Sequence, residues 1–210
     1  MSMAERVVAY VDGFNLYFGL KSSGWQRYYW LNMQKLASNL LKPGQALVAT
    51  KYFTSHVSGP PDKQKRQATF LEALQTLKEL KIFYGKFQMN PRNCRNCGFQ
   101  DAVPNEKMTD VNIAVELLTD AFQDSFDAAL LVSADSDLTA PVVAVRRLFP
   151  TKRTVVAFPP RRFSKELAKA ASVYLVIGRG VLAASVFPPQ VRKQDSFVLN
   201  CPPPWRGGQS

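Results

Sequence analysis

The chain alternates short apolar runs of strand length with longer segments of helical spacing. The apolar runs predict strands at residues 6–11, 46–53, 81–88, 127–134, 153–158 and 173–177. Helical spacing predicts helices at residues 31–41, 61–80 and 110–122, in the segment after Asp137, and from Ser164. Strands that alternate with helices in this way predict an α/β fold, with a mainly parallel central sheet and helices on both faces.

The pattern also makes narrower predictions about two of these helices. Ser136 is expected to cap the helix that follows the strand 127–134, because a serine hydroxyl can accept a hydrogen bond from a first-turn N–H. In the helix 110–122, the side chains expected to face the core are Val111, Ala114, Val115, Leu118 and Phe122.

Length and composition favour one globular domain, because a chain of 210 residues that is 46% hydrophobic can bury a sizeable core. We place that domain at residues 1–187, followed by a Pro- and Gly-rich tail at 188–210 that is either packed or disordered. The apolar runs fall short of the roughly 20 residues that span a bilayer. The first residues lead directly into a strand, so a cytoplasmic protein without a membrane partner is expected.

The net charge of +11 is concentrated in the last third of the chain. From Leu138 onward there are 12 of the 27 Lys and Arg residues but only 2 of the 16 acidic residues. Such an excess is typical of a nucleic-acid partner, although a solvated basic face would give the same count. The candidate phosphate-binding residues are Arg146, Arg147, Arg161, Arg162 and, before the helix 110–122, Lys107.

Four aspartates lie where apolar stretches stop or helices start: Asp12, Asp110, Asp135 and Asp137. In a parallel sheet the carboxyl ends of the strands meet along one edge, so these carboxylates should converge. Carboxylates that are close together repel one another, and a hard divalent cation such as Mg²⁺ or Mn²⁺ relieves the repulsion. The sequence therefore predicts a metal centre that performs phosphodiester chemistry.

Two polar residues accompany the aspartates. Asn15 lies one turn after Asp12 and could face the same ion, and with Ser133 it is expected to orient water or phosphate. Gly13 stands where the backbone must turn or approach a ligand. Simple helix capping by Asp12 or Asp135 is the competing explanation of the same pattern. Glu116 is a weaker candidate, because it lies off the helix face of Asp110.

Other chemistries find little support in the sequence. The chain has a single histidine, His56, and it has neither a Gly-x-Ser-x-Gly elbow nor a phosphate loop of the Gly-x-x-x-x-Gly-Lys type. The three cysteines cannot form a disulfide framework. Cys94 and Cys97 have half of a zinc-knuckle spacing, and Cys201 is too distant to be assumed as a ligand, so we expect no structural zinc.

Three motifs in order resemble the NYN domain family, a branch of the PIN-like nucleases: residues 11–17 (VDGFNLY), 107–118 (KMTDVNIAVELL) and 131–138 (LVSADSDL). Residues 156–160 (VAFPP) and 164–167 (SKEL) also fit, so the resemblance covers about residues 6–177. It implies a Rossmann-like PIN fold and Mg²⁺- or Mn²⁺-dependent ribonuclease activity. The acidic roles would fall on Asp12, Asp110, Asp135 and Asp137. The chain departs from the family pattern at Met108, where members usually carry glycine after the lysine.

The favoured function is hydrolysis of RNA phosphodiester bonds by one or two divalent ions. Asp12 and Asp135 are the first expected ligands, and Asp110 and Asp137 complete the shell. The alternative is a non-catalytic RNA-binding adaptor with the same fold. A phosphatase like the haloacid dehalogenases would need Asp-x-Asp at the first strand, where this chain has Asp12-Gly13-Phe14. The sequence is also compatible with a homo-oligomer.

Overall fold

The computed structural model describes residues 4–93 and 100–206, with side chains described outside residues 86–107. The predictions for Cys94 and Cys97 therefore lie outside the described residues, and so does the side chain of Lys107. No helix in the described ranges is both long and apolar enough to cross a bilayer.

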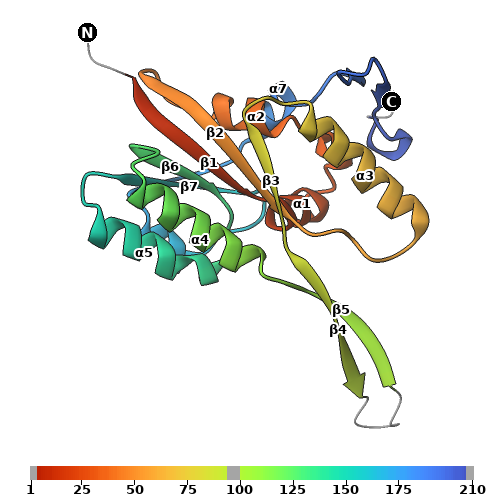
Figure 1. Cartoon of the computed structure of the whole chain (residues 1–210), viewed down its shortest axis with the longest axis horizontal. Helices are drawn as coiled ribbons and strands as arrows, with labels where there is room; N and C mark the ends of the chain where they lie inside the picture. The colour runs from red at the N-terminus through yellow and green to blue at the C-terminus, as the bar shows by residue number, and fades with distance from the viewer. Residues whose placement is uncertain (1–3, 94–99, 207–210) are drawn as a thin grey trace.

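Six parallel strands form the central sheet, in the order β3-β2-β1-β6-β7-β8 (Figure 1). They are β1 (Glu5–Asp12), β2 (Gln45–Thr54), β3 (Leu80–Tyr84), β6 (Ala128–Val132), β7 (Arg153–Phe158) and β8 (Val173–Val176). The predicted α/β fold with a parallel sheet is confirmed. The strand order reverses between β1 and β6, and that reversal makes their carboxyl ends the place where open α/β sheets bind ligands.

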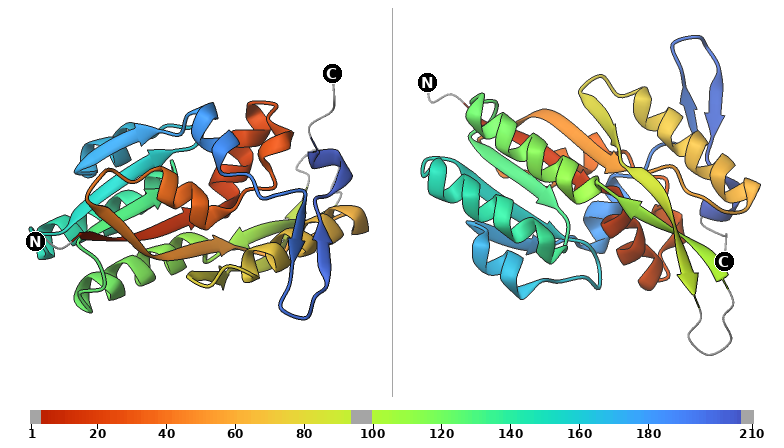
Figure 2. Two further views of the ribbon diagram at one scale, coloured as in Figure 1. Left: turned by 90° about the horizontal axis from the view of Figure 1, so that it is seen from above. Right: turned by 60° about the horizontal axis from the view of Figure 1, so that its bottom comes forward.

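Helices cover both faces of the sheet (Figures 1 and 2). One face carries α1 (Gly13–Ser22), α2 (Met33–Asn39), α3 (Pro61–Gln75) and α7 (Arg179–Ala184), and the other carries α4 (Thr109–Phe122), α5 (Thr139–Leu148) and α6 (Lys165–Ala170). Because successive side chains of a strand point to opposite faces, β1 serves both cores. Val7 and Val11 pack into the first core, while Val8 and Tyr10 pack into the second.

Helix α1 was not predicted from the sequence, because its aromatic and glycine content gives weak helical periodicity. Gly19 is needed there for packing: a Cβ at this position would lie 2.8 Å from both Pro159 Cβ and Pro160 O.

The predicted strand 81–88 is also interrupted. It ends as β3, and the chain continues into a hairpin of β4 (Lys86–Asn93) and β5 (Gln100–Lys107), which projects from the body of the molecule (Figure 1).

The predicted core face of α4 is wrong at three positions. Val111, Val115 and Phe122 are 57%, 53% and 70% exposed. The residues that α4 buries are Thr109, Ile113, Leu117, Asp120 and Ala121. The helix is therefore rotated toward a face that includes a carboxylate.

A polar network between α4 and the sheet explains this rotation. Lys51 Nζ of β2 lies 2.7 Å from Glu116 Oε2 and 2.7 Å from Asp120 Oδ2. The hydroxyl of Tyr10 donates a second bond to Asp120, at 2.5 Å. Because a buried carboxylate needs partners of this kind, α4 turns Asp120 inward and leaves valines outside. Glu116 belongs to this network, where it binds Lys51.

The C-terminal segment is packed over the residues that the structure describes, up to residue 206. It forms a hairpin of β9 (Gln190–Arg192) and β10 (Val198–Asn200), followed by the 3₁₀ helix η3 (Pro203–Trp205). Val191, Leu199 and Cys201 join the first core. Lys193 Nζ lies 3.1 Å from Glu72 Oε2 of α3, and Figure 2 shows the hairpin beside that helix.

Candidate metal centre

The candidate centre lies at the carboxyl ends of β1 and β6, where the strand order reverses. Asp12 is the last residue of β1, and Asp135 follows the neighbouring strand β6. Asp110 lies in the first turn of α4. Their charges are close enough to interact, because Asp110 and Asp135 both raise the pKa of Asp12. The structure thus brings Asp12 within electrostatic reach of Asp110 and Asp135, which follow it by 98 and 123 residues in the sequence.

Asp12 is 3% exposed and is held through both carboxylate oxygens. The backbone N–H of Asn15 donates to Oδ1 at 2.9 Å, so Asp12 caps α1. The hydroxyl of Ser133 donates to Oδ2 at 2.8 Å. Capping and ligation are compatible here, since each carboxylate oxygen has a further lone pair.

Asn15 and Ser133 tie the two strand ends together. Asn15 Oδ1 accepts a hydrogen bond from the backbone N–H of Ala134 at 3.1 Å. Ser133 Oγ accepts one from the N–H of Asp135 at 3.0 Å. Ser133 thus holds the carboxylate of Asp12, and the two side chains together hold the backbone that leads into Asp135. Their role toward water or phosphate stays a prediction.

Asp135 also caps the short 3₁₀ helix η2 (Ser136–Leu138), because its Oδ1 accepts a hydrogen bond from the N–H of Asp137 at 3.0 Å. The predicted cap by Ser136 is therefore wrong. The following helix α5 begins after Leu138, which makes no side-chain cap. The carboxylate of Asp137 is exposed beside this turn.

The electrostatics of the centre favour a cation. Burial, with smaller contributions from the charges of Asp110 and Asp135, raises the pKa of Asp12 to about 7, although the hydrogen bonds from Asn15 and Ser133 lower it. Burial raises the pKa of Asp110, as do Asp135 and Asp137. Oxygen ligands that repel one another suit Mg²⁺ or Mn²⁺. Among the side chains that the structure describes, no three Asp, Glu, His or Cys groups already stand close enough to hold one ion. Ligation would therefore draw the carboxylates together.

Gly13 serves close packing. A Cβ at this position would lie 2.5 Å from Tyr52 Oη and 2.8 Å from Phe53 O, both in β2. Only glycine lets the start of α1 approach the neighbouring strand so closely. Burial raises the pKa of Tyr52, and so does the charge of Asp12, which places the tyrosine hydroxyl beside the centre.

Met108, immediately before α4, has a left-handed backbone with φ of 81°. This conformation favours glycine, because an L side chain places its Cβ too close to the following carbonyl oxygen. Met108 lies two residues before Asp110, so this strained backbone belongs to the loop that leads into the candidate site.

Replacing Met108 with glycine is expected to raise the free energy of unfolding by about 0.5–1 kcal/mol, since the relieved strain exceeds the added chain entropy. Met108 is 45% exposed, so little packing is lost. Urea unfolding of both proteins measures the change. Met108→Ala is the control, since it shortens the side chain without relieving the backbone. A glycine variant less stable than this alanine variant would contradict the explanation.

The predicted phosphate-binding arginines fall at opposite ends of the sheet. Arg161 and Arg162 follow the carboxyl end of β7, and the guanidinium of Arg162 lies 5.7 Å from the ring centroid of Phe18 in α1. Arg146 and Arg147 occupy the last turn of α5, which begins at the carboxyl edge and returns along the sheet. That turn is therefore distant from the carboxylates, and RNA contact there stays a prediction.

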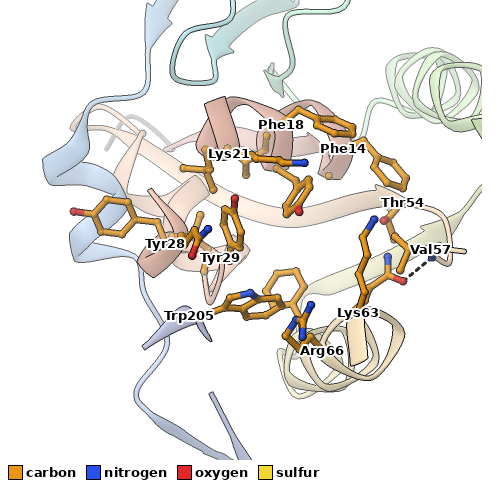
Figure 3. Close-up of a pocket in the computed structure, with 18 of the residues that line it drawn as sticks. Phe14, Phe18, Lys21, Tyr28, Tyr29, Thr54, Val57, Lys63, Arg66 and Trp205 are labelled. Atoms are coloured by element: carbon orange, nitrogen blue, oxygen red, sulfur yellow. Dashed lines mark hydrogen bonds between the residues drawn. The ribbon is translucent and has the colours of Figure 1, made fainter. Parts of the chain in front are cut away.

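A cavity of about 450 Å³ adjoins the centre. It lies between α1, the loop after β2, α3 and the C-terminal segment (Figure 3). Gly13 and Tyr52 form part of its wall. The cavity was not predicted from the sequence. The pattern that could have indicated it is the mixture of basic and aromatic residues in residues 19–30 (GLKSSGWQRYYW).

Comparison with known proteins agrees with this architecture. Residues 6–178 match the NYN domain family. The chain is 26% identical over 190 residues to 6-hydroxy-3-succinoylpyridine 3-monooxygenase HspA of Pseudomonas putida, a match that covers 73% of this chain and 59% of that protein. The chain thus spans about three fifths of that relative's length. A crystal structure of a protein of unknown function from Vibrio parahaemolyticus has a TM-score of 0.58 and 19% identity, over 89% of this chain and 99% of that one.

Proposed function

Because this chain belongs to the NYN domain family, we propose that it is a divalent-metal-dependent ribonuclease whose centre is formed by Asp12, Asp110, Asp135 and Asp137. The observation that carries the proposal is the burial of Asp12 at the end of β1, where the strand order reverses, with Asp110 and Asp135 near enough to raise its pKa. A site that gathers carboxylates at a sheet's switch point, against their repulsion, is arranged for a cation.

Asp12 and Asp135 would hold the ion, since Ser133 donates to the carboxylate of Asp12 and accepts from the backbone N–H of Asp135, which links the two residues. Asp110 and Asp137 approach the same site from α4 and η2, and would complete the ligand set. Bound Mg²⁺ or Mn²⁺ would supply charge stabilisation at the scissile phosphate and a more acidic water. The hydrogen bonds of Asn15 and Ser133 keep the two strand ends at a fixed spacing during the reaction.

The test is cleavage of single-stranded and structured RNA by the purified protein with Mg²⁺, with Mn²⁺ and with chelator. The proposed metal-dependent ribonuclease should cut RNA only when a divalent ion is present. A non-catalytic RNA-binding adaptor would bind the same RNA and leave it intact under all three conditions, which would overturn the proposal.

The arginine pair after β7 is expected to contribute RNA affinity. Changing Arg161 and Arg162 to alanine should weaken binding of RNA regardless of its sequence. The log–log dependence of affinity on salt should flatten by about 0.7 for each lost phosphate contact with a single strand. Binding measured between low and moderate salt tests this expectation.

The comparison variant is the double alanine change at Arg146 and Arg147. It removes the same charge at the distant end of α5, so a smaller change in slope is expected. If both pairs change the slope equally, RNA contacts extend along the whole basic face. An unchanged slope after loss of Arg161 and Arg162 would contradict their role.

A second candidate function is an enzyme acting on a small aromatic molecule. The aromatic-lined cavity favours it, and one relative is named as a monooxygenase of 6-hydroxy-3-succinoylpyridine. Incubation of the protein in air with that compound and a reduced nicotinamide, followed by chromatography of the mixture, tests this candidate, because a monooxygenase needs O₂ and a two-electron donor. Turnover of the compound without RNA cleavage would select it over the ribonuclease.

A further inference from the structure

The cavity beside the metal centre has flat aromatic walls. Tyr29 packs against Tyr17, with ring centroids 4.9 Å apart, and against Trp205, at 5.8 Å and an interplanar angle of 81°. Trp205 in turn lies 6.2 Å from Phe70 of α3. Such surfaces bind a planar ring by stacking or edge contact.

The charge of the cavity is of one sign. Lys21 of α1 and both Lys63 and Arg66 of α3 line it (Figure 3). Among the described residues that line it, none is acidic. None of these three cations forms an ion pair with a side chain that the structure describes. Cations that no carboxylate neutralises favour an anionic ligand, and phosphate is the anion such side chains bind most often in nucleic-acid sites.

The walls of the cavity are held in place before any ligand binds. Gln67 of α3 accepts a hydrogen bond from the N–H of Val57 at 2.8 Å, the dashed line in Figure 3. Its side-chain N–H donates to the carbonyl of Ser55 at 2.8 Å. These bonds fix the loop after β2 against α3. A preformed site loses less conformational entropy on binding.

The cavity and the carboxylates share a wall. Gly13, which follows Asp12, and Tyr52, whose pKa the charge of Asp12 raises, both line the cavity. A ligand in the cavity thus lies next to the place where the scissile phosphate would bind. Trp205 on the far wall lies beyond residues 6–178, so the C-terminal segment completes the cavity from outside the matched domain.

We infer that this cavity holds one unpaired nucleotide of the RNA strand, next to the phosphodiester bond at the metal centre. The base would lie against Tyr29 and Trp205, and the phosphate would meet Lys63 and Arg66. The volume of about 450 Å³ falls within the roughly 300–1,000 Å³ of small-ligand sites. A base paired in a duplex cannot enter such a cavity, so the substrate is single-stranded at this position. The inference rests on the proposed ribonuclease function.

The test measures binding separately from cleavage. With chelator present, a short labelled single-stranded RNA is titrated with the parent and with the Lys63→Ala/Arg66→Ala variant, and the variant is expected to bind at least about 10-fold more weakly. Lys65→Ala is the matched control, because it removes one charge from the exposed side of α3 outside the cavity. With Mn²⁺, the double variant should raise KM more than it lowers kcat. Lys21→Ala, on the opposite wall, is the second variant and should weaken binding in the same direction.

Competition identifies what the cavity recognises. A nucleoside 5′-monophosphate should displace the RNA, the unphosphorylated nucleoside should do so much less, and a hydroxypyridine carboxylate should not. Binding by the double variant equal to that of the Lys65→Ala control, or stronger competition by the pyridine, would overturn the inference. Asp135→Asn separates the two proposals: if it binds RNA normally and still cuts it, the assigned centre fails while the cavity stands.

Discussion

Replacing Asp135 with asparagine is expected to lower the rate of RNA cleavage at least about 100-fold, because the change removes a charged ligand without changing side-chain volume. The fold should persist, since the amide oxygen of asparagine can still accept the hydrogen bond from the N–H of Asp137. Initial rates in Mn²⁺, with circular dichroism as a check of folding, measure the effect. Asp12→Asn is expected to reduce cleavage comparably.

The control is Asp195→Asn, an exposed aspartate in the turn of the C-terminal hairpin. It carries the same chemical change far from the centre and should cut RNA at the parent's rate. If the double variant at Asp12 and Asp135 still cut RNA as fast as the parent, the metal centre would have to be assigned elsewhere.

Asp12→Asn is also expected to stabilise the metal-free protein, by an amount that grows with pH. Burial raises the pKa of Asp12 from 3.8 to about 7, so folding opposes its ionisation. Such a separation corresponds to at most about 4 kcal/mol of unfolding free energy above neutral pH. Urea unfolding in chelator at several pH values measures it.

The number of protons that the folded and unfolded states bind sets the direction of this stability difference. Below pH 4 the carboxyl group of Asp12 is protonated in both states, so the variant and the parent should be equally stable. As pH rises from about 4 to about 7, the unfolded chain ionises first and the parent loses stability, while asparagine does not. Above pH 7 the difference should be constant. Added Mg²⁺ or Mn²⁺ should restore stability to the parent and not to the variant.

Asp127→Asn provides a control of opposite sign. Hydrogen bonds from Arg6 lower the pKa of Asp127 to about 2, so its ionised form stabilises the fold. Its replacement should cost stability above about pH 4, and this cost should decline as the pH falls from about 4 to about 2. If Asp12→Asn behaved like Asp127→Asn, the description of Asp12 as a buried, repelled carboxylate would be refuted.

The alternation of strands and helices was sufficient to predict the parallel sheet, because burial on both faces requires nearly continuous apolar strands. It failed for α4, where it placed Val111 and Val115 inward. The buried side of that helix contains Asp120, whose partners Lys51 and Tyr10 lie in other strands. A local pattern treats every carboxylate as a surface residue, because it cannot show that residues distant in sequence supply the hydrogen bonds and charge that a buried carboxylate needs.

The sequence by itself determined that Asp12, Asp110 and Asp135 lie at one edge of a parallel sheet, since each marks the end of a strand or the start of a helix there. Only the tertiary structure decided what surrounds them. The raised pKa of Asp12 depends on how completely the fold removes water, and the cavity depends on Trp205 packing beside Tyr29, 176 residues earlier in the chain. Such contacts have no local periodicity, because they are set by how whole elements pack.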